Sequence, residues 1–252
     1  ADLLALKIAA EDISPKEAAL SGGVSIGTID SVLYRAVSKG LLLSPETFIR
    51  RDKCMEPSVP KELTEFMSAD IFTLQWHITQ TCDLRCKHCY DRSDRLPLSY
   101  ARAVAILDDF YDFCQAMHVR GQVTFTGGNP LLYPAFPRLY QETSDRGFGI
   151  AILGNPSPMH QIEGLTQIAK PLFFQVSLEG LEPHNDSIRG AGHFQRTLAF
   201  LDQLKAQEIF SMVMLTLTRG NMHQVLPLAE TLRDRTDFFT FNRLSTVGEG
   251  AQ

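Results

Sequence analysis

Short runs of β-favouring residues alternate with helix-length amphipathic stretches from residue 72 to the end of the chain. The predicted strands are FTLQWHIT (72–79), QVTFTGG (122–128), FGIAILGN (148–155), LFFQVSLEG (172–180), FSMVMLTLT (210–218) and FFTFNRLS (238–245). Each gap between them is long enough for a helical crossover, the connection that parallel strands need. The pattern therefore predicts six β/α units in series and an α/β fold.

The longest gap, between the first two strands, has apolar residues at three- and four-residue steps. They are Val104, Leu107, Tyr111, Cys114 and Met117. This spacing predicts a helix whose apolar face covers the strands. Cys114 lies on that face, where a small buried side chain is a simpler interpretation than a metal ligand. Further crossover helices are predicted at 134–146, 159–169, 193–207 and 222–234.

The chain before residue 72 predicts helices only. Ser14, Pro15 and Glu17 form an N-cap, a first-turn proline and the acid of a capping box. After a glycine turn, a stripe of apolar residues at helical spacing runs through TIDSVLYRAVSK (28–39). Helix, turn and helix in this order are the outline of a helix-turn-helix.

We divide the chain into a helical module at 1–49, a linker rich in charge and proline at 50–70, and an α/β domain at 71–252. DNA binding by the module is disfavoured, because residues 1–60 hold seven Lys or Arg against eight Asp or Glu. A protein that neutralises phosphates needs a basic excess. A docking or packing module is the preferred interpretation, and Cys54 in the linker is expected to be a free surface thiol.

Composition and charge restrict the class of protein further. The net charge of −5 and the pI near 5.8 give no support for a polyanionic partner. No apolar run reaches the length of about 18 residues that suggests a membrane span, and the N-terminus carries acids where a signal peptide carries bases. The five cysteines, three of them close together, favour a metal site in a reducing compartment over disulfides. We therefore expect a cytoplasmic protein without nucleic-acid or membrane partners.

Three of these cysteines, Cys82, Cys86 and Cys89, follow the first predicted strand in TCDLRCKHCYD. They therefore lie at the carboxyl end of a strand, where β/α barrels place their active sites. A zinc site and an iron–sulfur cluster both use such thiolates. His88 could complete a zinc set, but it is adjacent to Cys89, and no second CxxC pair follows. A [4Fe-4S] cluster held by three cysteines leaves one iron open for a further ligand, as a catalyst requires.

The pattern CxxxCxxC followed by an aromatic residue, here Tyr90, resembles the signature of the radical S-adenosylmethionine (SAM) enzymes. The resemblance extends over about residues 72–251 and implies a partial (β/α)6 TIM-like barrel. It also implies that SAM chelates the open iron of a [4Fe-4S] cluster held by the three cysteines. In that family one electron cleaves SAM to methionine and a 5′-deoxyadenosyl radical, which abstracts hydrogen from the substrate. A low-potential electron donor of the flavodoxin or ferredoxin type is then an expected partner.

Further residues match the family's motifs at the ends of the second and third strands. Gly127, Gly128, Asn129 and Pro130 stand where the family has GGEP, the motif that contacts the SAM amino group. Asn129 replaces the usual Glu; it keeps a carbonyl acceptor and loses the charge. Asn155, at the end of the third strand, is expected to be a pocket residue of unassigned role.

The fourth strand ends in QVSLEG, which resembles the SLDG strand of peptide-modifying members of the family. Its Ser177 and Glu179 are expected to share one face by the two-residue period of a strand. The resemblance assigns them contacts with the ribose and methionine parts of SAM. HNDSIRG (184–190) resembles the downstream HD-x-x-RG stretch with one extra residue, so Arg189 is predicted to pair with the SAM carboxylate. A surface ion pair is the alternative for Arg189.

The QVSLEG and HNDSIRG stretches also indicate a substrate class. The sequence is most similar to SPASM-type maturases, which modify ribosomal peptides or protein side chains, and more narrowly to maturases of thio(seleno)oxazole-type peptides. Many such enzymes carry extra clusters in a cysteine-rich C-terminal extension. With only Cys54 and Cys114 to spare, this sequence could not hold one, so we expect a minimal member or a sequence truncated before that extension.

The helical module is then expected to dock a leader peptide, since a small helical fold can offer a groove to a partner. Three alternatives stay open at this point. They are a zinc-stabilised helix-turn-helix regulator, a radical SAM enzyme that acts on a small molecule, and an inactive family member that only binds a partner.

Overall fold

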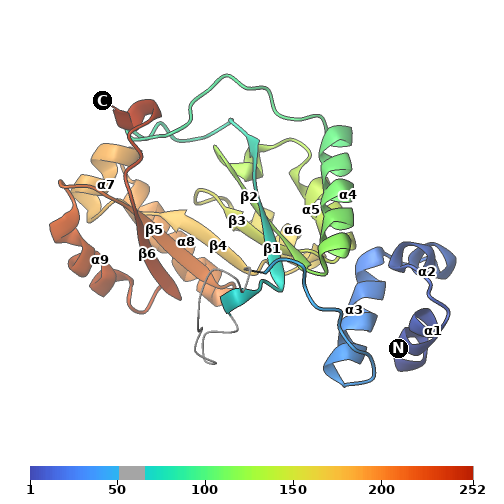
Figure 1. Cartoon of the computed structure of the whole chain (residues 1–252). Helices are drawn as coiled ribbons and strands as arrows, with labels where there is room; N and C mark the ends of the chain where they lie inside the picture. Colours follow the sequence, from blue (N-terminus) through green and yellow to red (C-terminus); the bar gives the residue numbers. More distant parts are fainter. Residues whose placement is uncertain (51–65, 252) are drawn as a thin grey trace. The chain divides into compact units, whose positions relative to one another are not determined.

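The computed structural model describes residues 1–50 and 66–251 (Figure 1). Most of the predicted linker, with Cys54, lies outside the described residues. The chain forms two compact units: one of Ala1–Leu74, Ala101–Val123 and Gln141–Gly149, the other of Gln75–Tyr100, Thr124–Tyr140 and Ile150–Gln252. The domain boundaries expected near residues 49 and 70 stay a prediction.

Six strands form one sheet in the order β1-β2-β3-β4-β5-β6, so each strand lies beside its neighbours in the sequence. The strands are β1 (Ile71–Thr79), β2 (Arg120–Gly127), β3 (Gly149–Leu153), β4 (Phe173–Ser177), β5 (Ser211–Leu217) and β6 (Phe238–Arg243). The β3–β4, β4–β5 and β5–β6 pairs are parallel. The predicted α/β fold is confirmed, although β3 and β4 end earlier than expected.

Helices connect successive strands, as parallel pairing requires. They are α4 (Tyr100–Met117), α5 (Phe136–Asp145), α6 (Met159–Ile168), α8 (His193–Ala206) and α9 (Val225–Leu232), with the 3-10 turns η3 (Pro130–Leu132), η4 (Met222–Gln224) and η5 (Gly248–Ala251). The sequence pattern missed α7 (Glu182–Arg189), which lies in the stretch interpreted only as a motif. Its first turn holds Glu182 and Pro183, residues favoured there. Within the described ranges, no helix combines the length and the apolar character that a bilayer crossing needs.

Aromatic rings pack β1 and β2 together in the core below the strand ends. Trp76 of β1 stacks on Phe125 of β2 with ring centroids 6.0 Å apart. Phe125 meets Phe136 of α5 edge to face at 5.2 Å, and Phe136 meets Tyr140 at 5.9 Å. Pairs of this geometry contribute stability beyond the area that they bury. The two strands that lead into the cysteine and glycine loops are therefore firmly positioned.

Cys114 on α4 is the small buried residue that the pattern predicted. It is 3% exposed. Burial raises the pKa of its thiol to about 11, which disfavours the thiolate that metals bind.

The predicted helical module consists of α1 (Asp2–Ala10), α2 (Pro15–Gly22) and α3 (Ile26–Ser38), blue in Figure 1. The capping box of α2 is confirmed. The Ser14 hydroxyl accepts the backbone N–H of Glu17 at 3.2 Å, and the Glu17 carboxylate accepts the backbone N–H of Ser14 at 3.1 Å. Helices α1 and α2 both pack on α3, and they bury Ile8, Ala19 and Ile29 between them.

Helix α3 makes a close backbone contact with the turn after α5. A Cβ added to Gly27 would lie 2.5 Å from the backbone nitrogen of Gly147. One turn further along α3, Asp30 accepts a hydrogen bond from the Tyr111 hydroxyl at 3.1 Å, and burial raises the pKa of Asp30 to about 6. The contact between Gly27 and Gly147 leaves no room for a side chain at position 27. The position of α3 against this turn therefore requires glycine there.

We expect Gly27→Ala to lower the free energy of unfolding by about 1–3 kcal/mol, because the backbone near Gly147 must move. Gly164→Ala in α6 is the matched control, a helical glycine with no atom within 4 Å of the added carbon. It should raise stability by about 0.5–1 kcal/mol through helix propensity. Urea unfolding followed by circular dichroism measures both, and effects of the same sign would contradict the close contact.

Candidate active site

The loop after β1 lines a cavity of about 780 Å³ in the second compact unit. Cys82, Cys86 and Cys89 all line it. So do residues at or just beyond the carboxyl ends of the other strands, among them Gly127, Asn155, Ser177, Thr216 and Asn242. The polar strand ends that the sequence indicated therefore meet in one cavity.

The three thiols form a donor set that fits an iron–sulfur cluster. All three are free. The Cys82 sulfur accepts the backbone N–H of Leu84 at 3.4 Å and Nδ2 of Asn155 at 3.5 Å, and such N–H donors tune cluster thiolates. Within the described ranges, no group of three His, Cys, Asp or Glu side chains is arranged as the ligands of one metal ion. Three thiolates are the donors that a [4Fe-4S] cluster with one open iron uses.

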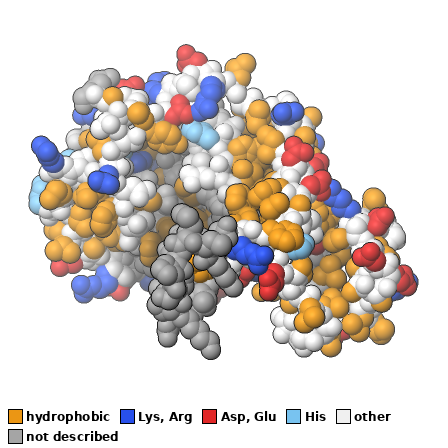
Figure 2. All heavy atoms as spheres, viewed as in Figure 1, with side chains coloured by type: hydrophobic (Ala, Val, Ile, Leu, Met, Phe, Trp, Pro, Cys, Tyr) orange, Lys and Arg blue, Asp and Glu red, His pale blue; other side chains and the backbone are white. Residues whose placement is uncertain are grey.

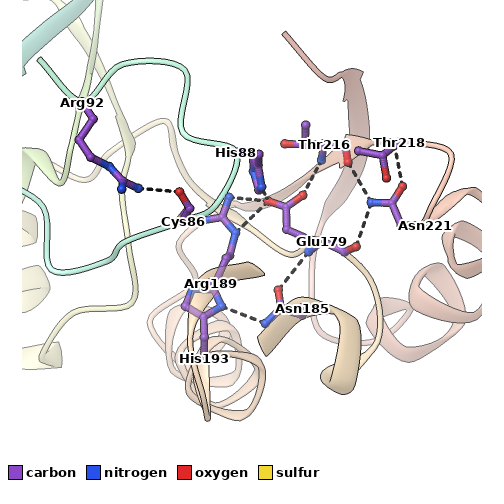
Figure 3. A network of polar contacts seen from close by, with 10 residues as sticks. All are labelled: Cys86, His88, Arg92, Glu179, Asn185, Arg189, His193, Thr216, Thr218 and Asn221. Atoms are coloured by element: carbon purple, nitrogen blue, oxygen red, sulfur yellow. Dashed lines mark hydrogen bonds and ion pairs between the residues drawn. The ribbon is translucent and has the colours of Figure 1, made fainter. Parts of the chain in front are cut away.

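Two contacts hold the centre of the cysteine loop against α7 and the segment after β4. The backbone N–H of Lys87 donates to the carbonyl of Ile188 at 3.1 Å. His88 Nε2 lies 3.3 Å from a carboxylate oxygen of Glu179 (Figure 3). His88 is therefore directed at Glu179, which weighs further against the Cys3His zinc set.

The turn η5 contacts the end of the same loop. The backbone N–H of Glu249 donates to the carbonyl of Cys89 at 2.9 Å, and the Glu249 carboxylate lies 3.6 Å from Arg92. Arg92 in turn donates to the carbonyl of Cys86 at 2.6 Å (Figure 3). The segment after β6 thus stabilises the backbone that carries two of the cysteines.

Glu179 is the centre of a buried polar network (Figure 3). Its carboxylate accepts two hydrogen bonds from Arg189, at 2.5 and 2.8 Å, and the backbone N–H of Thr216 at 2.9 Å. Burial opposes ionisation of Glu179, but the charge of Arg189 and the contact with His88 hold its pKa well below the usual range. The carboxylate is therefore charged, and each of its two oxygens has at least one partner.

Two asparagines that sequence reasoning missed fix the backbone of Glu179. Asn185 Oδ1 accepts its N–H at 3.0 Å, and Asn221 Nδ2 donates to its carbonyl at 3.0 Å. Both side chains are buried, at 0% and 1% exposure. Asn185 is the extra residue in the HD-x-x-RG-like stretch, which was the one available signal. Asn221 comes from beyond β5, and nothing in the local sequence indicates its partner.

Asp83, also missed, links the cysteine loop to the ends of β2 and β3. Its Oδ1 accepts Nδ2 of Asn129 at 3.1 Å and Nδ2 of Asn155 at 2.7 Å. The Oδ1 of Asn129 accepts the backbone N–H of Leu131 at 3.3 Å, where η3 starts at Pro130. Asn129 and Pro130 are buried and do not line the cavity, whereas Asn155 does. The SAM contacts expected of Asn129 and Pro130 stay predictions.

The paired glycines lie where the chain after β2 approaches the end of β1. A Cβ on Gly127, whose φ is +137°, would collide with the carbonyl of Thr79 and lie 2.7 Å from the ring of His77. A Cβ on Gly128 would lie 2.7 Å from the carbonyl of Gln80. Because no side chain fits, both positions require glycine, and both residues line the cavity.

The ring of His77 packs beside Gly127. Among the described side chains, its Nε2 is the buried polar atom that lacks a hydrogen-bond partner, which is unusual in a folded protein. Burial lowers the pKa of His77, which favours the neutral ring. This nitrogen lies outside the lining of the cysteine cavity.

Some of the remaining predicted residues line the cavity, and Glu179 lies behind it. Tyr90, Ser177 and Arg189 line the cavity. Glu179 lies beyond the last residue of β4 and is 1% exposed, so the two-residue period does not extend to it and it does not share the cavity face of Ser177. The ion pair of Arg189 is buried and internal, unlike the surface pair considered as its alternative.

A fold with parallel strands in chain order, and three cysteines in the loop after the first, defines a class of metalloenzyme. The chain belongs to the Radical SAM superfamily, whose family model matches residues 76–232. The predicted family is confirmed. Enzymes of this family use a [4Fe-4S] cluster and SAM, so the predicted cofactors are confirmed.

Two curated relatives are similar to this chain over about three quarters of its length. Fe-coproporphyrin III synthase of Methanosarcina barkeri is 24% identical over 206 residues, which are 77% of this chain and 49% of that protein. The mycofactocin maturase MftC of Mycobacterium ulcerans is 28% identical over 207 residues, 78% of this chain and 54% of that protein. The chain spans about half the length of these relatives.

Among solved structures, SuiB of Streptococcus suis shares the fold. Its complex with SAM has a TM-score of 0.58 at 19% identity, over 74% of this chain and 44% of SuiB. Its complex with the precursor peptide SuiA has a TM-score of 0.57 at 19% identity, over 88% of this chain and 54% of SuiB. The predicted TIM-like barrel fold is thereby confirmed.

We expect Gly128→Ala to weaken SAM binding at least about tenfold, or about 1.4 kcal/mol, because the added carbon displaces the loop that ends β1. Gly220→Ala is the matched control, since its added carbon would meet its nearest atoms at an ordinary 3.7 Å. Calorimetric titration of the anaerobically reconstituted proteins with SAM measures both. Equal affinities would refute the role given to the glycine loop.

Proposed function

We propose that this protein is a radical SAM enzyme that abstracts hydrogen from a peptide or protein side chain in order to modify it. The observation that carries the proposal is the single cavity that brings together three free cysteines, the glycine loop and polar strand ends. When bound, the cluster supplies the electron that cleaves SAM to a 5′-deoxyadenosyl radical. A low-potential donor of the flavodoxin or ferredoxin type provides that electron.

The protein's own contribution is to bind and orient the cofactors and the substrate and to exclude side reactions. Cys82, Cys86 and Cys89 hold the cluster. The open backbone at Gly127 and Gly128 receives the amino group of SAM, and Tyr90, Asn155, Ser177 and Arg189 line the same cavity as further contacts for it. Asn129, Pro130 and Glu179 act through the shape of the loops that carry these groups.

A peptide substrate is supported by what the relatives are called. MftC is named a maturase, and SuiB has been solved bound to a precursor peptide. The QVSLEG and HNDSIRG stretches resemble those of peptide-modifying members of the family. A cytoplasmic location remains a prediction from the sequence.

The helical module offers a place for such a peptide. The first compact unit contains a cavity of about 1150 Å³ that shares no lining residue with the cysteine cavity. Tyr34 of α3 lines it, with the guanidinium of Arg120 4.9 Å from its ring. A short antiparallel bridge between Arg50 and Ser68 lies at its wall. Other lining residues are Leu33, Val37, Thr47, Met67 and His118.

The surface of the module favours a peptide over DNA as the occupant. Figure 2 shows apolar side chains exposed on these N-terminal helices beside scattered charges of both signs. The exposed apolar residues of this region include Leu3, Tyr34, Leu41 and Leu43. An apolar, mixed-charge surface suits a peptide and lacks the basic excess that phosphates need. We therefore propose that the leader of the substrate peptide docks in this cavity.

A second candidate is a radical SAM enzyme that acts on a small molecule of the tetrapyrrole type. One observation favours it, the similarity to Fe-coproporphyrin III synthase over 77% of this chain. Tight binding of iron coproporphyrin III to the reconstituted protein, together with no binding of any precursor peptide, would select this candidate.

We expect the full chain, purified without oxygen, to hold about four irons and to release 5′-deoxyadenosine from SAM after reduction. Cys86→Ala should lose the iron and the activity. Cys114→Ala is the matched control and should retain both, since Cys114 is buried on α4 and distant in sequence from the loop. Iron analysis and chromatography of the products provide the measurements. One zinc and no iron would contradict the proposal.

For docking, we expect Tyr34→Ala to weaken binding of a precursor peptide encoded beside the gene by about tenfold, or about 1.4 kcal/mol. Leu20→Ala is the matched control, because Leu20 is also exposed but does not line the cavity. Fluorescence anisotropy with the full chain and a labelled peptide measures both. Binding of duplex DNA with a steep salt dependence, and of no peptide, would refute docking.

A further inference from the structure

The Glu179–Arg189 ion pair is buried directly behind the cysteine loop. The two side chains are 2% and 11% exposed. A buried pair is costly unless hydrogen bonds satisfy both partners. Here the carboxylate is satisfied by Arg189, by the backbone N–H of Thr216 and by the contact with His88 of the cysteine loop (Figure 3). The carboxylate of the pair is thus fully hydrogen-bonded, and it contacts the loop that carries the cluster ligands.

The pair lies beside the cluster ligand Cys86. Arg189 and Cys86 line the same cavity. The carbonyl of Ile188, the residue before Arg189, accepts the backbone N–H of Lys87, the residue after Cys86, at 3.1 Å. His88, two residues after Cys86, lies 3.3 Å from the Glu179 carboxylate. A cation and its compensating anion are therefore both held next to a cluster ligand.

We propose that the Glu179–Arg189 pair sets the reduction potential of the cluster through the balance of its two charges at Cys86. Both residues are then positioning residues that act on the cluster through its ligand, whether or not Arg189 also contacts SAM. This inference rests on the proposed function only in requiring that a cluster is bound.

The sign of the effect follows from electrostatics. Reduction adds negative charge to the cluster, so a nearby cation favours the reduced form and a nearby anion disfavours it. In the native protein the anion of Glu179 compensates the cation of Arg189. Arg189 cannot lose its proton, so neutralising Glu179 leaves an uncompensated positive charge beside Cys86. Neutralising both removes the cation as well.

We expect Glu179→Gln to shift the midpoint potential of the reconstituted cluster upward. The double variant Glu179→Gln/Arg189→Gln should return it toward the wild-type value, since both charges are gone. Asp202→Asn is the matched control, because it breaks an exposed ion pair, with Arg235 at 2.6 Å, away from the cysteine loop; no shift is expected there. Potentiometric titration of the full chain, monitored by electron paramagnetic resonance without SAM, measures all four proteins.

A cluster that forms in Glu179→Gln with an unchanged potential would overturn the inference. So would a double variant whose potential moves as far as that of the single variant, because damage to the fold does not cancel when a second charge is removed. If Glu179→Gln does not retain iron, Glu179→Asp provides the comparison: its shorter carboxylate compensates Arg189 less, and the expected shift is smaller and again upward. No shift in that variant would overturn the inference. A wild-type chain without iron would instead refute the proposed function.

Discussion

The cysteine cavity of this protein depends on one constraint: the carboxyl ends of its parallel strands lie at the same edge of the sheet. Strands that pair in parallel bring their carboxyl ends to one edge of the sheet, and here they pair in the order in which the chain makes them. The loop after each strand therefore meets the loops after its neighbours. The cysteines after β1, the glycines after β2, Asn155 after β3 and Ser177 at the end of β4 line one cavity for this reason.

Polar contacts hold that edge in shape. Asp83, itself exposed, joins three loops with a single carboxylate oxygen that accepts from Asn129 and Asn155. The buried carboxylate of Glu179 joins the cysteine loop, α7 and β5. A buried carboxylate is stable only when its partners are complete, so Glu179 fixes loop positions that apolar packing alone leaves free. Polar contacts thus position the loops of the cofactor site, and aromatic packing between β1, β2 and α5 positions the strands below them.

The N-terminal helices follow a different design. Their interior is a small apolar cluster around α3, and their outer surface keeps exposed apolar side chains without an excess of either charge. The cavity in the same compact unit is larger than the cofactor cavity and has no cysteine ligand of the cluster in its lining. Its lining is mainly apolar, as the proposed docking of a leader peptide requires.

The sequence alone determined the local features. Periodicity located all six strands, the capping residues Ser14 and Glu17 marked the start of α2, and the cysteine spacing with Tyr90 indicated the family. These signals are readable because they depend on residues within one or two turns of each other. Only the tertiary structure decided the contacts between distant residues: the pairing of Glu179 with His88 and Arg189, the fixing of its backbone by Asn221, and the inward position of Asn129. A buried polar side chain is defined by partners that other strand ends supply, and no local pattern names them.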